Sequence, residues 1–320
     1  MSSWSRRTFV GTSLAALAAC QSPGNSGGNA SSNAPTRVNL PPPSPPRLPM
    51  GTVFKGEAKF QQLMARGRRE NWARQPLGHR TATVGRALIG IPYENFTLEI
   101  DDRIESPSVN FNGLDCWTYY EIALGCARML KLPEQRQTPL ALLHMIEIER
   151  YRNGVCNGSY TSRMHHLEEV FHDNERRGLG TNVTRSLGGE RLQRQVRYMP
   201  TVWRSYRYLR NNPELVPELE RIEARISTLP VYHIPKNRVA GIENRLQNGD
   251  VIAITSTWKH GYTSHVGLAL REGSRCRFMH ATSENHKGRR TIIDGTISSY
   301  LSERANRAGI IVFRPVDVFA

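Results

Sequence analysis

Cys116 is the first candidate for chemistry, and it stands in the stretch GLDCWTYYEIALG (113–125). Most free cysteines in folded proteins are small buried hydrophobes, so the residues around it must distinguish a nucleophile. Gly113 indicates a turn, Asp115 is a favoured N-cap, and apolar residues follow Cys116 at nearly helical spacing. Cys116 is therefore expected in the first turn of a helix, where unpaired N–H groups and the helix dipole favour a thiolate.

A cysteine nucleophile also needs a base, and His265 and His280 are the candidates. Each histidine lies near one end of a predicted strand, and a short Glu-Gly-Ser turn joins the two strands. Side chains on one face of antiparallel neighbours are about 5 Å apart, so the two rings could touch. We expect His265 to present Nε2 to the Cys116 sulfur while His280 orients its ring through Nδ1.

Helices are expected to come first and strands last in the part of the chain that carries these residues. The helical pattern covers 57–74, 78–88, 116–130, 138–150, 163–176 and 213–227. Short β-branched and aromatic runs separated by turn residues cover 251–255, 264–272, 276–282, 290–294 and 309–315, which is typical of an antiparallel meander. This order predicts an α+β fold.

The N-terminus predicts export. Residues 1–20 contain paired arginines and a short apolar run, and Leu-Ala-Ala-Cys at 17–20 resembles a bacterial lipobox. Cys20 would then be the lipidated first residue of a mature lipoprotein in the periplasm or cell envelope. Residues 21–50 are rich in Pro, Gly, Ser and Asn and predict a disordered tether. The remaining 51–320 are long enough for one large domain or for a core fold with an insertion.

The amino-acid composition indicates which class of partner the protein favours. The net charge is +15 and the isoelectric point is near 10.1, which favours anionic partners. For an exported protein we expect lipid head groups and cell-wall carboxylates rather than nucleic acid. With Cys116 kept free, at most one disulfide is expected among Cys126, Cys156 and Cys276.

Several motifs together resemble a known family. Asp115-Cys-Trp-Thr-Tyr-Tyr-Glu121 matches a DCxTxxE pattern, Gly90-Ile-Pro-Tyr93 matches an earlier Gly-x-Pro-Tyr, and Tyr160-Thr-Ser-Arg-Met-His165 matches Tyr-x-x-Arg-x-His. With Ser264-His-Val-Gly267 and Met279-His-Ala-Thr-Ser283, their order resembles that of the NlpC/P60 cysteine hydrolases. The branch they resemble most is the N-acetylmuramoyl-L-alanine amidase-like one, formerly DUF1460, over most of residues 85–315.

The resemblance implies one cysteine hydrolase domain over 51–320, with a circularly permuted papain-like core and a helical insertion at about 135–228. It also implies hydrolysis of the amide between N-acetylmuramic acid and L-alanine in peptidoglycan fragments, with no metal and no organic cofactor. Cys116 would attack, His265 would transfer the proton and His280 would orient His265. The Cys116 N–H and the Tyr93 hydroxyl would bind the oxyanion, although a tyrosine in a Pro-Tyr turn could equally be a packing residue. Arg163 could hold a carboxylate or sugar, or be an ion-paired helix residue.

Other functions stay open at this point. His165, Glu169 and His172 fall on one helical face and could bind zinc, although the HExxH spacing is absent. Residues 176–210 hold nine arginines, Tyr198, Trp203, Tyr206 and Tyr208, which suits an anionic surface or simply a solvated face. A stem-peptide endopeptidase and a non-catalytic peptidoglycan-binding lipoprotein are the alternatives to an amidase. The oligomeric state cannot be read from the sequence.

Overall fold

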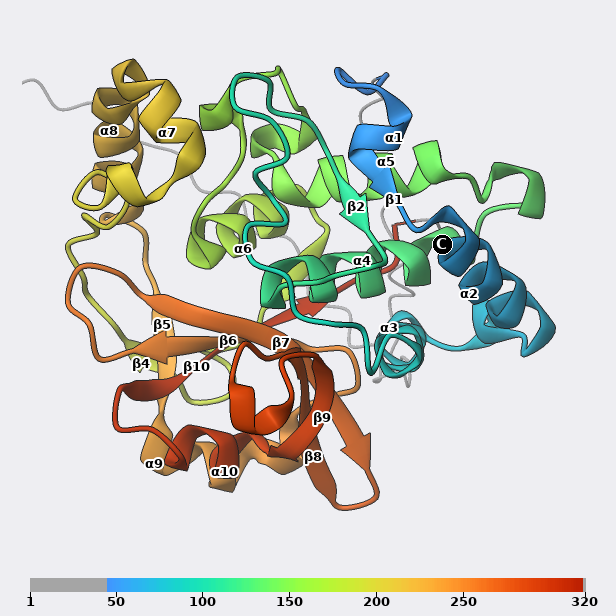
Figure 1. Cartoon of the computed structure of the whole chain (residues 1–320). Coiled ribbons are helices and arrows are strands. Elements are labelled where there is room, and N and C mark those ends of the chain that lie inside the picture. The colour runs from blue at the N-terminus through green and yellow to red at the C-terminus, as the bar shows by residue number, and fades with distance from the viewer. Residues whose placement is uncertain (1–44, 319–320) are drawn as a thin grey trace, which may run out of the picture. The chain divides into compact units, whose positions relative to one another are not determined.

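The helices predicted in the first part of the chain are all present in the computed structural model, which describes residues 45–318 (Figure 1). Their caps follow from sequence: Thr138 accepts a hydrogen bond from the Ala141 N–H at the start of α5, where Pro139 is the first helical residue. The predicted helices are α2 (Glu57–Arg69), α3 (Leu77–Ala87), α4 (Cys116–Met129), α5 (Pro139–Arg150), α6 (Leu167–Arg176) and α8 (Val216–Ile226). Shorter helices are α1 (Met50–Val53), α7 (Arg207–Asn211), α9 (Lys236–Val239) and α10 (Ile297–Ser302).

The predicted signal segment 1–20, with Cys20, and the tether up to residue 44 lie outside the described residues. Those predictions are therefore untested. None of the helices between residues 45 and 318 combines the length and apolar character needed to cross a bilayer.

The strands form one antiparallel sheet whose order is β4-β5-β10-β6-β7-β8-β9, with β3 also paired to β10. The meander expected from the sequence is confirmed for the four strands β6 to β9, whereas β10 returns to pair with β6 and β5. The strands are β3 (Gly180–Asn182), β4 (Glu190–Arg191), β5 (Tyr232–Pro235), β6 (Val251–Ser256), β7 (Thr263–Glu272), β8 (Arg275–Ala281), β9 (Thr291–Thr296) and β10 (Arg307–Pro315). A separate parallel pair joins β1 (Phe54–Lys55) and β2 (Val109–Asn110).

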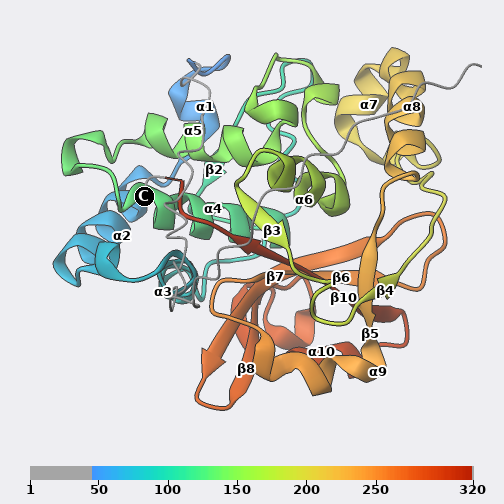
Figure 2. The same ribbon diagram turned by 180° about the vertical axis from the view of Figure 1, so that it is seen from behind.

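Helices cover both faces of the sheet, in unequal numbers (Figures 1 and 2). The larger hydrophobic core lies between the sheet and α3, α4 and α5, and it includes Val266, Leu268 and Met279. The smaller core lies on the opposite face, where Phe278 packs with Tyr300 of α10. This alternation of neighbouring residues between two faces follows from the two-residue repeat of a strand. The mixed helix and antiparallel-sheet architecture predicted from the sequence is confirmed.

The helix α4 is the central helix of the larger core. Its residues from Thr118 to Met129 are buried around the whole circumference, which explains why the sequence reads as apolar on every side. Glu121 and Arg150 are buried side chains that pair at 2.7 Å, and they join α4 to α5. The N-terminus of α4 is thus held rigidly against its neighbours.

Candidate active site

Cys116 is the first residue of α4, and Asp115 caps the helix. The Thr118 N–H donates to Oδ1 of Asp115 at 2.8 Å, and the Asp115 N–H donates to Oγ1 of Thr118 at 3.1 Å. The Thr97 hydroxyl donates to the second carboxylate oxygen of Asp115 at 2.7 Å. This capping box fixes where the helix starts, and with it the position of Cys116.

Tyr93 lies next to the start of the same helix. Its segment forms a parallel bridge to Leu114, and the Glu94 N–H donates to the Leu114 carbonyl at 3.1 Å. Burial, and after it the proximity of Cys116 and Asp115, raise the pKa of the Tyr93 phenol. The hydroxyl therefore keeps its proton at neutral pH and can donate a hydrogen bond.

The strand β7 brings His265 to the cysteine. The backbone N–H of Val266, the residue after His265, lies against the Cys116 sulfur and opposes the rise in the pKa of the thiol. Cys116 and His265 also line one cavity of about 290 Å³. The sulfur and the His265 ring form no hydrogen bond within the described residues, as is common before substrate binds.

The two histidines meet, as the strand pairing predicts. Nε2 of His265 lies 2.8 Å from Nδ1 of His280. The expectation that Nε2 of His265 faces the sulfur is therefore wrong, because His280 occupies that nitrogen. Nδ1 is the ring nitrogen of His265 that stays available to the cysteine.

Gly267 explains how the histidines come so close. It lies on the same face of β7 as His265, and the register that pairs Leu268 with Met279 places it directly opposite His280. A Cβ atom at Gly267 would lie 2.4 Å from the Met279 carbonyl oxygen and 2.8 Å from Cβ of His280. Only glycine leaves space for the His280 ring at this point of the sheet.

Asp294 is a site residue that sequence reasoning missed. Its Oδ2 lies 3.2 Å from Nε2 of His280 and 2.6 Å from Nζ of Lys287, which also reaches Glu303 at 2.8 Å. Burial opposes ionisation of Asp294, but hydrogen bonds from His280 and Lys287 outweigh it and hold the carboxyl pKa well below its usual range. An ionised carboxylate only accepts hydrogen bonds, so His280 must carry its proton on Nε2.

The proton on Nε2 of His280 determines which ring nitrogen donates and which accepts between the two histidines. With its proton on Nε2, neutral His280 accepts at Nδ1, and His265 must donate there from its own Nε2. Nδ1 of His265 is then unprotonated and can accept a proton. Burial and the neighbouring His280 lower the pKa of His265 well below its usual value, which keeps the ring neutral.

The expected stabilisation of a thiolate at Cys116 is contradicted. Burial, and after it the negative Asp115, raise the pKa of the thiol to about 12 even though N–H groups of Val266 and the helix start oppose the shift. The capping carboxylate offsets the helix dipole at this position. The raised pKa makes Cys116 a neutral thiol at neutral pH.

Arg163 is not in the cavity, in contrast to the expected substrate contact. Its side chain is 4% exposed, and its Nε lies 3.2 Å from Oε2 of Glu105. The guanidinium also lies 4.7 Å from the centre of the Tyr160 ring. The alternative of an ion-paired residue is the one that the structure shows.

The zinc alternative has no support in the geometry. His165 bonds through Nε2 to the Tyr160 carbonyl oxygen at 3.0 Å, and Glu169 forms an ion pair with Arg152 at 2.7 Å. His172 lines a different cavity from His165. Within residues 45–318, no three His, Cys, Asp or Glu side chains come together in a way that could hold a metal ion.

The aromatic residues of 176–210 separate into two groups. Tyr198 and Tyr206 line the cavity of Cys116, together with Trp258 and Trp117. Tyr208 is buried in the large core instead. The arginines of this segment contact different neighbours, as Arg177 pairs with Asp173 at 2.7 Å and Arg207 donates to the Glu99 carbonyl oxygen at 2.8 Å.

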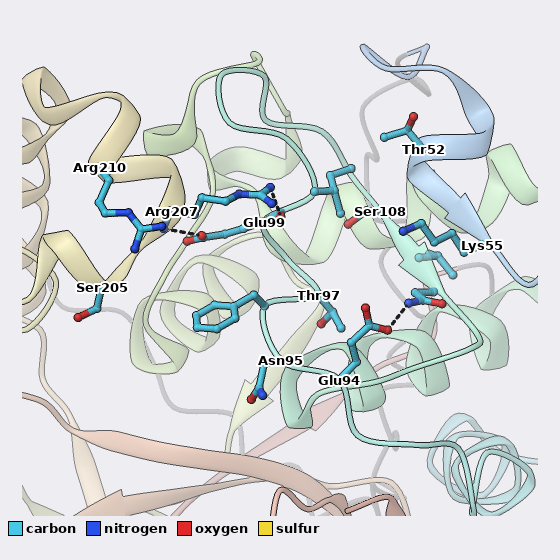
Figure 3. A pocket seen from close by; sticks show the side chains of 14 residues that line it. Thr52, Lys55, Glu94, Asn95, Thr97, Glu99, Ser108, Ser205, Arg207 and Arg210 are labelled. Atoms are coloured by element: carbon cyan, nitrogen blue, oxygen red, sulfur yellow. Dashed lines mark hydrogen bonds between the residues drawn. The ribbon is translucent and has the colours of Figure 1, made fainter.

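Figure 3 shows a second cavity, of about 510 Å³. It neighbours the first, because Ser205 and Arg207 line the second cavity and Tyr206, between them, lines the first. Arg207 and Arg210 of α7 and Lys55 of β1 bring positive charge to it, and Glu94 and Glu99 bring negative charge. The Asn110 amide donates to Glu94 at 2.8 Å, and Nη2 of Arg207 donates to the Glu99 carbonyl oxygen at 2.8 Å. Neither Cys116 nor His265 lines this cavity.

The cysteines of the described chain are all free, so the one disulfide that was allowed does not form. Cys126, Cys156 and Cys276 are buried, and Cys116 is the partly exposed one. Their packing is that of small hydrophobic residues.

Comparison with known proteins identifies the family. A family model described as N-acetylmuramoyl-L-alanine amidase-like matches residues 83–310. The chain belongs to this amidase-like family. The match includes the capped cysteine, both histidines and Asp294, so the family region contains the whole site. No curated protein matches the sequence.

Solved structures agree with this family. An N-acetylmuramoyl-L-alanine amidase from Bacteroides uniformis is 26% identical, with a TM-score of 0.69 over 75% of this chain and 99% of its own. A Bacteroides fragilis protein provisionally named a xylanase is 29% identical, with a TM-score of 0.63 over 72% and 99%. A DUF1460 protein from Legionella pneumophila is 18% identical, with a TM-score of 0.60 over 82% and 97%, and shows the shared fold.

Proposed function

We propose that the protein hydrolyses the amide between the lactyl group of N-acetylmuramic acid and L-alanine in peptidoglycan fragments, with Cys116 as nucleophile. The observation that carries the proposal is the continuous contact chain from the cysteine cavity through His265 and His280 to Asp294. Membership of the amidase-like family supports the choice of the amide bond. The contact chain supports a mechanism in which His265 removes the Cys116 proton.

Acylation begins when Nδ1 of His265 takes the Cys116 proton as the sulfur attacks the lactyl carbonyl carbon. The negative oxygen that forms is held by the Cys116 N–H and the Tyr93 hydroxyl. His265 then gives its proton to the L-alanine nitrogen, the C–N bond breaks, and the peptide leaves with a free amine. A thioester joins Cys116 to the lactyl group.

Deacylation reverses these roles with water. Nδ1 of His265 takes a proton from water, and the resulting hydroxide attacks the thioester carbonyl. The C–S bond breaks and His265 returns the proton to the sulfur. His280 and Asp294 act through His265 by keeping its Nδ1 unprotonated before each proton transfer.

The same arrangement supports a papain-like core of the NlpC/P60 type. Such a core pairs a cysteine at a helix start with a histidine on an antiparallel sheet, and α4 and β7 provide both here. Cys116, His265 and His280 follow one another in the order that this resemblance implies.

Glycoside hydrolysis is the alternative raised by the name of the Bacteroides fragilis protein. Glycosidases place two carboxyl groups about 5–9.5 Å apart around the bond they cut. None of the described residues lining the Cys116 cavity is Asp or Glu. The cavity favours acyl transfer from a thiol.

Product analysis tests the proposal. The purified full-length chain and its Cys116→Ala variant are incubated with N-acetylmuramoyl-L-alanyl-D-isoglutamine, and products are identified by mass spectrometry. We expect N-acetylmuramic acid and a dipeptide beginning at L-alanine from the wild type only. Cuts within the peptide would indicate an endopeptidase, and binding without any cut would indicate a peptidoglycan-binding protein. Unchanged turnover in Cys116→Ala would overturn the role of the cysteine.

We further infer export as a lipoprotein anchored through Cys20, from the paired arginines and the lipobox-like Leu-Ala-Ala-Cys. Metabolic labelling with an alkyne fatty acid in a bacterial host tests this inference. Label on the full-length chain that is lost in Cys20→Ala is the expected result, and equal labelling of both proteins would contradict it.

A further inference from the structure

Two exposed aromatic rings form a corner in the cavity that contains Cys116. Tyr198 is 38% exposed and Trp258 is 41% exposed, although both are large and largely apolar. Their ring centres are 4.7 Å apart and their planes meet at 84°. The rings therefore offer two nearly perpendicular apolar walls within the lining of the reaction cavity.

The corner is rigid because two distant segments of the chain are bonded together at its base. The Arg197 N–H donates to the His260 carbonyl oxygen at 3.0 Å, and the Arg194 N–H donates to the Tyr262 hydroxyl at 3.2 Å. The Trp258 N–H donates to Oγ of Ser256 at 2.9 Å. These bonds place the rings before a ligand arrives, which lowers the entropy cost of binding.

The charge of the cavity limits what can bind against these walls. No Asp, Glu, Lys or Arg is among the described residues that line it, and His166, which does line it, is already paired with Glu223 at 2.9 Å. The stem peptide of peptidoglycan carries carboxylates, and burying them without partners would be costly. The N-acetylmuramoyl group has no charge once its lactyl carboxyl is in the amide bond. Its ring has an apolar C–H face that suits the negative face of an aromatic ring.

We propose that the Tyr198–Trp258 corner binds the N-acetylmuramoyl sugar ring and so sets the direction in which substrate crosses Cys116. This inference rests on the proposed amidase function. The sugar packs against the two rings, the lactyl carbonyl reaches Cys116, and the charged peptide extends out of this cavity. The corner is a specificity element, because it contacts the sugar and none of the reacting atoms.

The test compares two substrates that differ only in the sugar. One is N-acetylmuramoyl-L-alanyl-D-isoglutamine, and the other is D-lactyl-L-alanyl-D-isoglutamine. We expect Trp258→Ala and Tyr198→Ala to lower kcat/KM for the first about tenfold to a hundredfold while changing the second less than about threefold. Trp258→Phe keeps a ring and should recover much of the loss. Equal losses on both substrates, or none, would overturn the proposal.

Phe96→Ala is the matched control. Phe96 is 65% exposed and lines the neighbouring charged cavity, so its removal deletes an exposed ring of similar kind elsewhere. We expect the ratio of kcat/KM for the two substrates to stay at the wild-type value in this variant. A ratio that changes as much as in Trp258→Ala would contradict the assignment of the sugar to the Tyr198–Trp258 corner.

A binding measurement separates this inference from the proposed function. Calorimetric titration of N-acetylmuramoyl-L-alanine into Cys116→Ala, and into the same variant carrying Trp258→Ala, needs no turnover. We expect binding at least about tenfold weaker without the tryptophan. Equal affinity would overturn the sugar site even if the amidase chemistry holds. Loss of affinity together with intact turnover in Cys116→Ala would instead reject the nucleophile and leave the sugar site standing.

Discussion

At the scale of single residues, the site combines a neutral thiol with a neutral imidazole. Burial and Asp115 raise the pKa of Cys116 to about 12, while burial and His280 lower the pKa of His265 well below its usual value. Both shifts oppose a thiolate–imidazolium ion pair in the resting protein. In the proposed mechanism the proton therefore moves only when the sulfur attacks, with His265 as a general base.

The raised pKa of Cys116 and the lowered pKa of His265 predict how alkylation and turnover depend on pH. Iodoacetamide reacts with the thiolate, so its rate at Cys116 should rise about tenfold for each pH unit to pH 9 without a plateau. The acidic limb of kcat/KM should lie below the usual histidine pKa of about 6.5, because His265 stays neutral to lower pH. Cys116→Ala corrects for alkylation of the other four cysteines, Cys20 included. An alkylation rate already constant below pH 7 would show a stable thiolate and contradict the neutral pair.

Asp294→Asn tests the direction of the hydrogen-bond chain. The new amide can donate to Nε2 of His280, which would move the His280 proton to Nδ1 and force the His265 proton onto the nitrogen that serves as base. We expect kcat to fall about 10²- to 10⁴-fold with little change in KM, since Asp294 does not line the cavity.

Glu303→Gln is the matched control for this variant, because Glu303 touches Lys287 but not His280. Its kcat should stay within about tenfold of the wild type. An Asp294→Asn protein as active as Glu303→Gln would show that the carboxylate does not orient the histidines.

At the scale of elements, local signals explain what the sequence could predict. The cap at Asp115, the helical spacing after Cys116 and the alternating runs from 251 to 282 all act over a few residues, and each predicted element is present. The contact of His265 with His280 follows from one hairpin. Sequence reasoning failed where a contact depends on distant pairing, as in the return of β10 to β6 and β5.

Asp294 shows the same limit within the site. It lies in β9 where the register with β8 shifts between Arg277 and Met279, and such a bulge redirects side chains. Nothing in RTIID marks the bulge. The predicted substrate contact of Arg163 failed for another reason. Residue type alone does not reveal whether an arginine is buried with a carboxylate, as Arg163 is with Glu105.

The helix that carries Cys116 depends on a buried ion pair. Glu121 and Arg150 are both fully buried, and Arg150 also bonds Ser108. Glu121→Gln removes one charge and leaves the other uncompensated, so we expect the free energy of unfolding in urea to fall by about 3–5 kcal/mol. A loss of less than about 1 kcal/mol would mean that the pair does not hold α4 in place.

The control for that variant is Glu272→Gln. Glu272 pairs with Arg86 at 2.5 Å, but both side chains are substantially exposed, so the pair is screened by water. We expect a change of less than about 1 kcal/mol in the free energy of unfolding. The contrast between the two variants isolates burial as the cause.

At the scale of the whole molecule, we expect the net charge and the Cys116 cavity to make separate contributions to substrate recognition. The chain carries a net charge of +15, whereas the described lining of the Cys116 cavity has no Asp, Glu, Lys or Arg. Under the proposed function, we expect the positive charge to attract an anionic wall over long distances and the cavity to select the bond that is cut. Because salt screens exposed charges, it should weaken the contribution of the net charge and leave that of the cavity nearly unchanged.

Salt should therefore affect polymer and fragment differently. Between 50 and 500 mM NaCl, we expect retention of the full-length chain on insoluble peptidoglycan to fall severalfold, because exposed charges are screened over roughly 10 Å or less. Turnover of N-acetylmuramoyl-L-alanyl-D-isoglutamine should change less than about twofold over the same range. A parallel loss of both would place the charge effect within the reaction cavity.

The most direct test of the central claim is to trap the covalent intermediate. Acid-quenched reactions of the full-length chain with N-acetylmuramoyl-L-alanyl-D-isoglutamine are digested, and the peptide containing Cys116 is examined by mass spectrometry. We predict a thioester of N-acetylmuramic acid that carries no amino acid. An adduct that retains L-alanine would place the cut within the peptide, and product formation with an adduct on another residue, or with none, would contradict catalysis by Cys116.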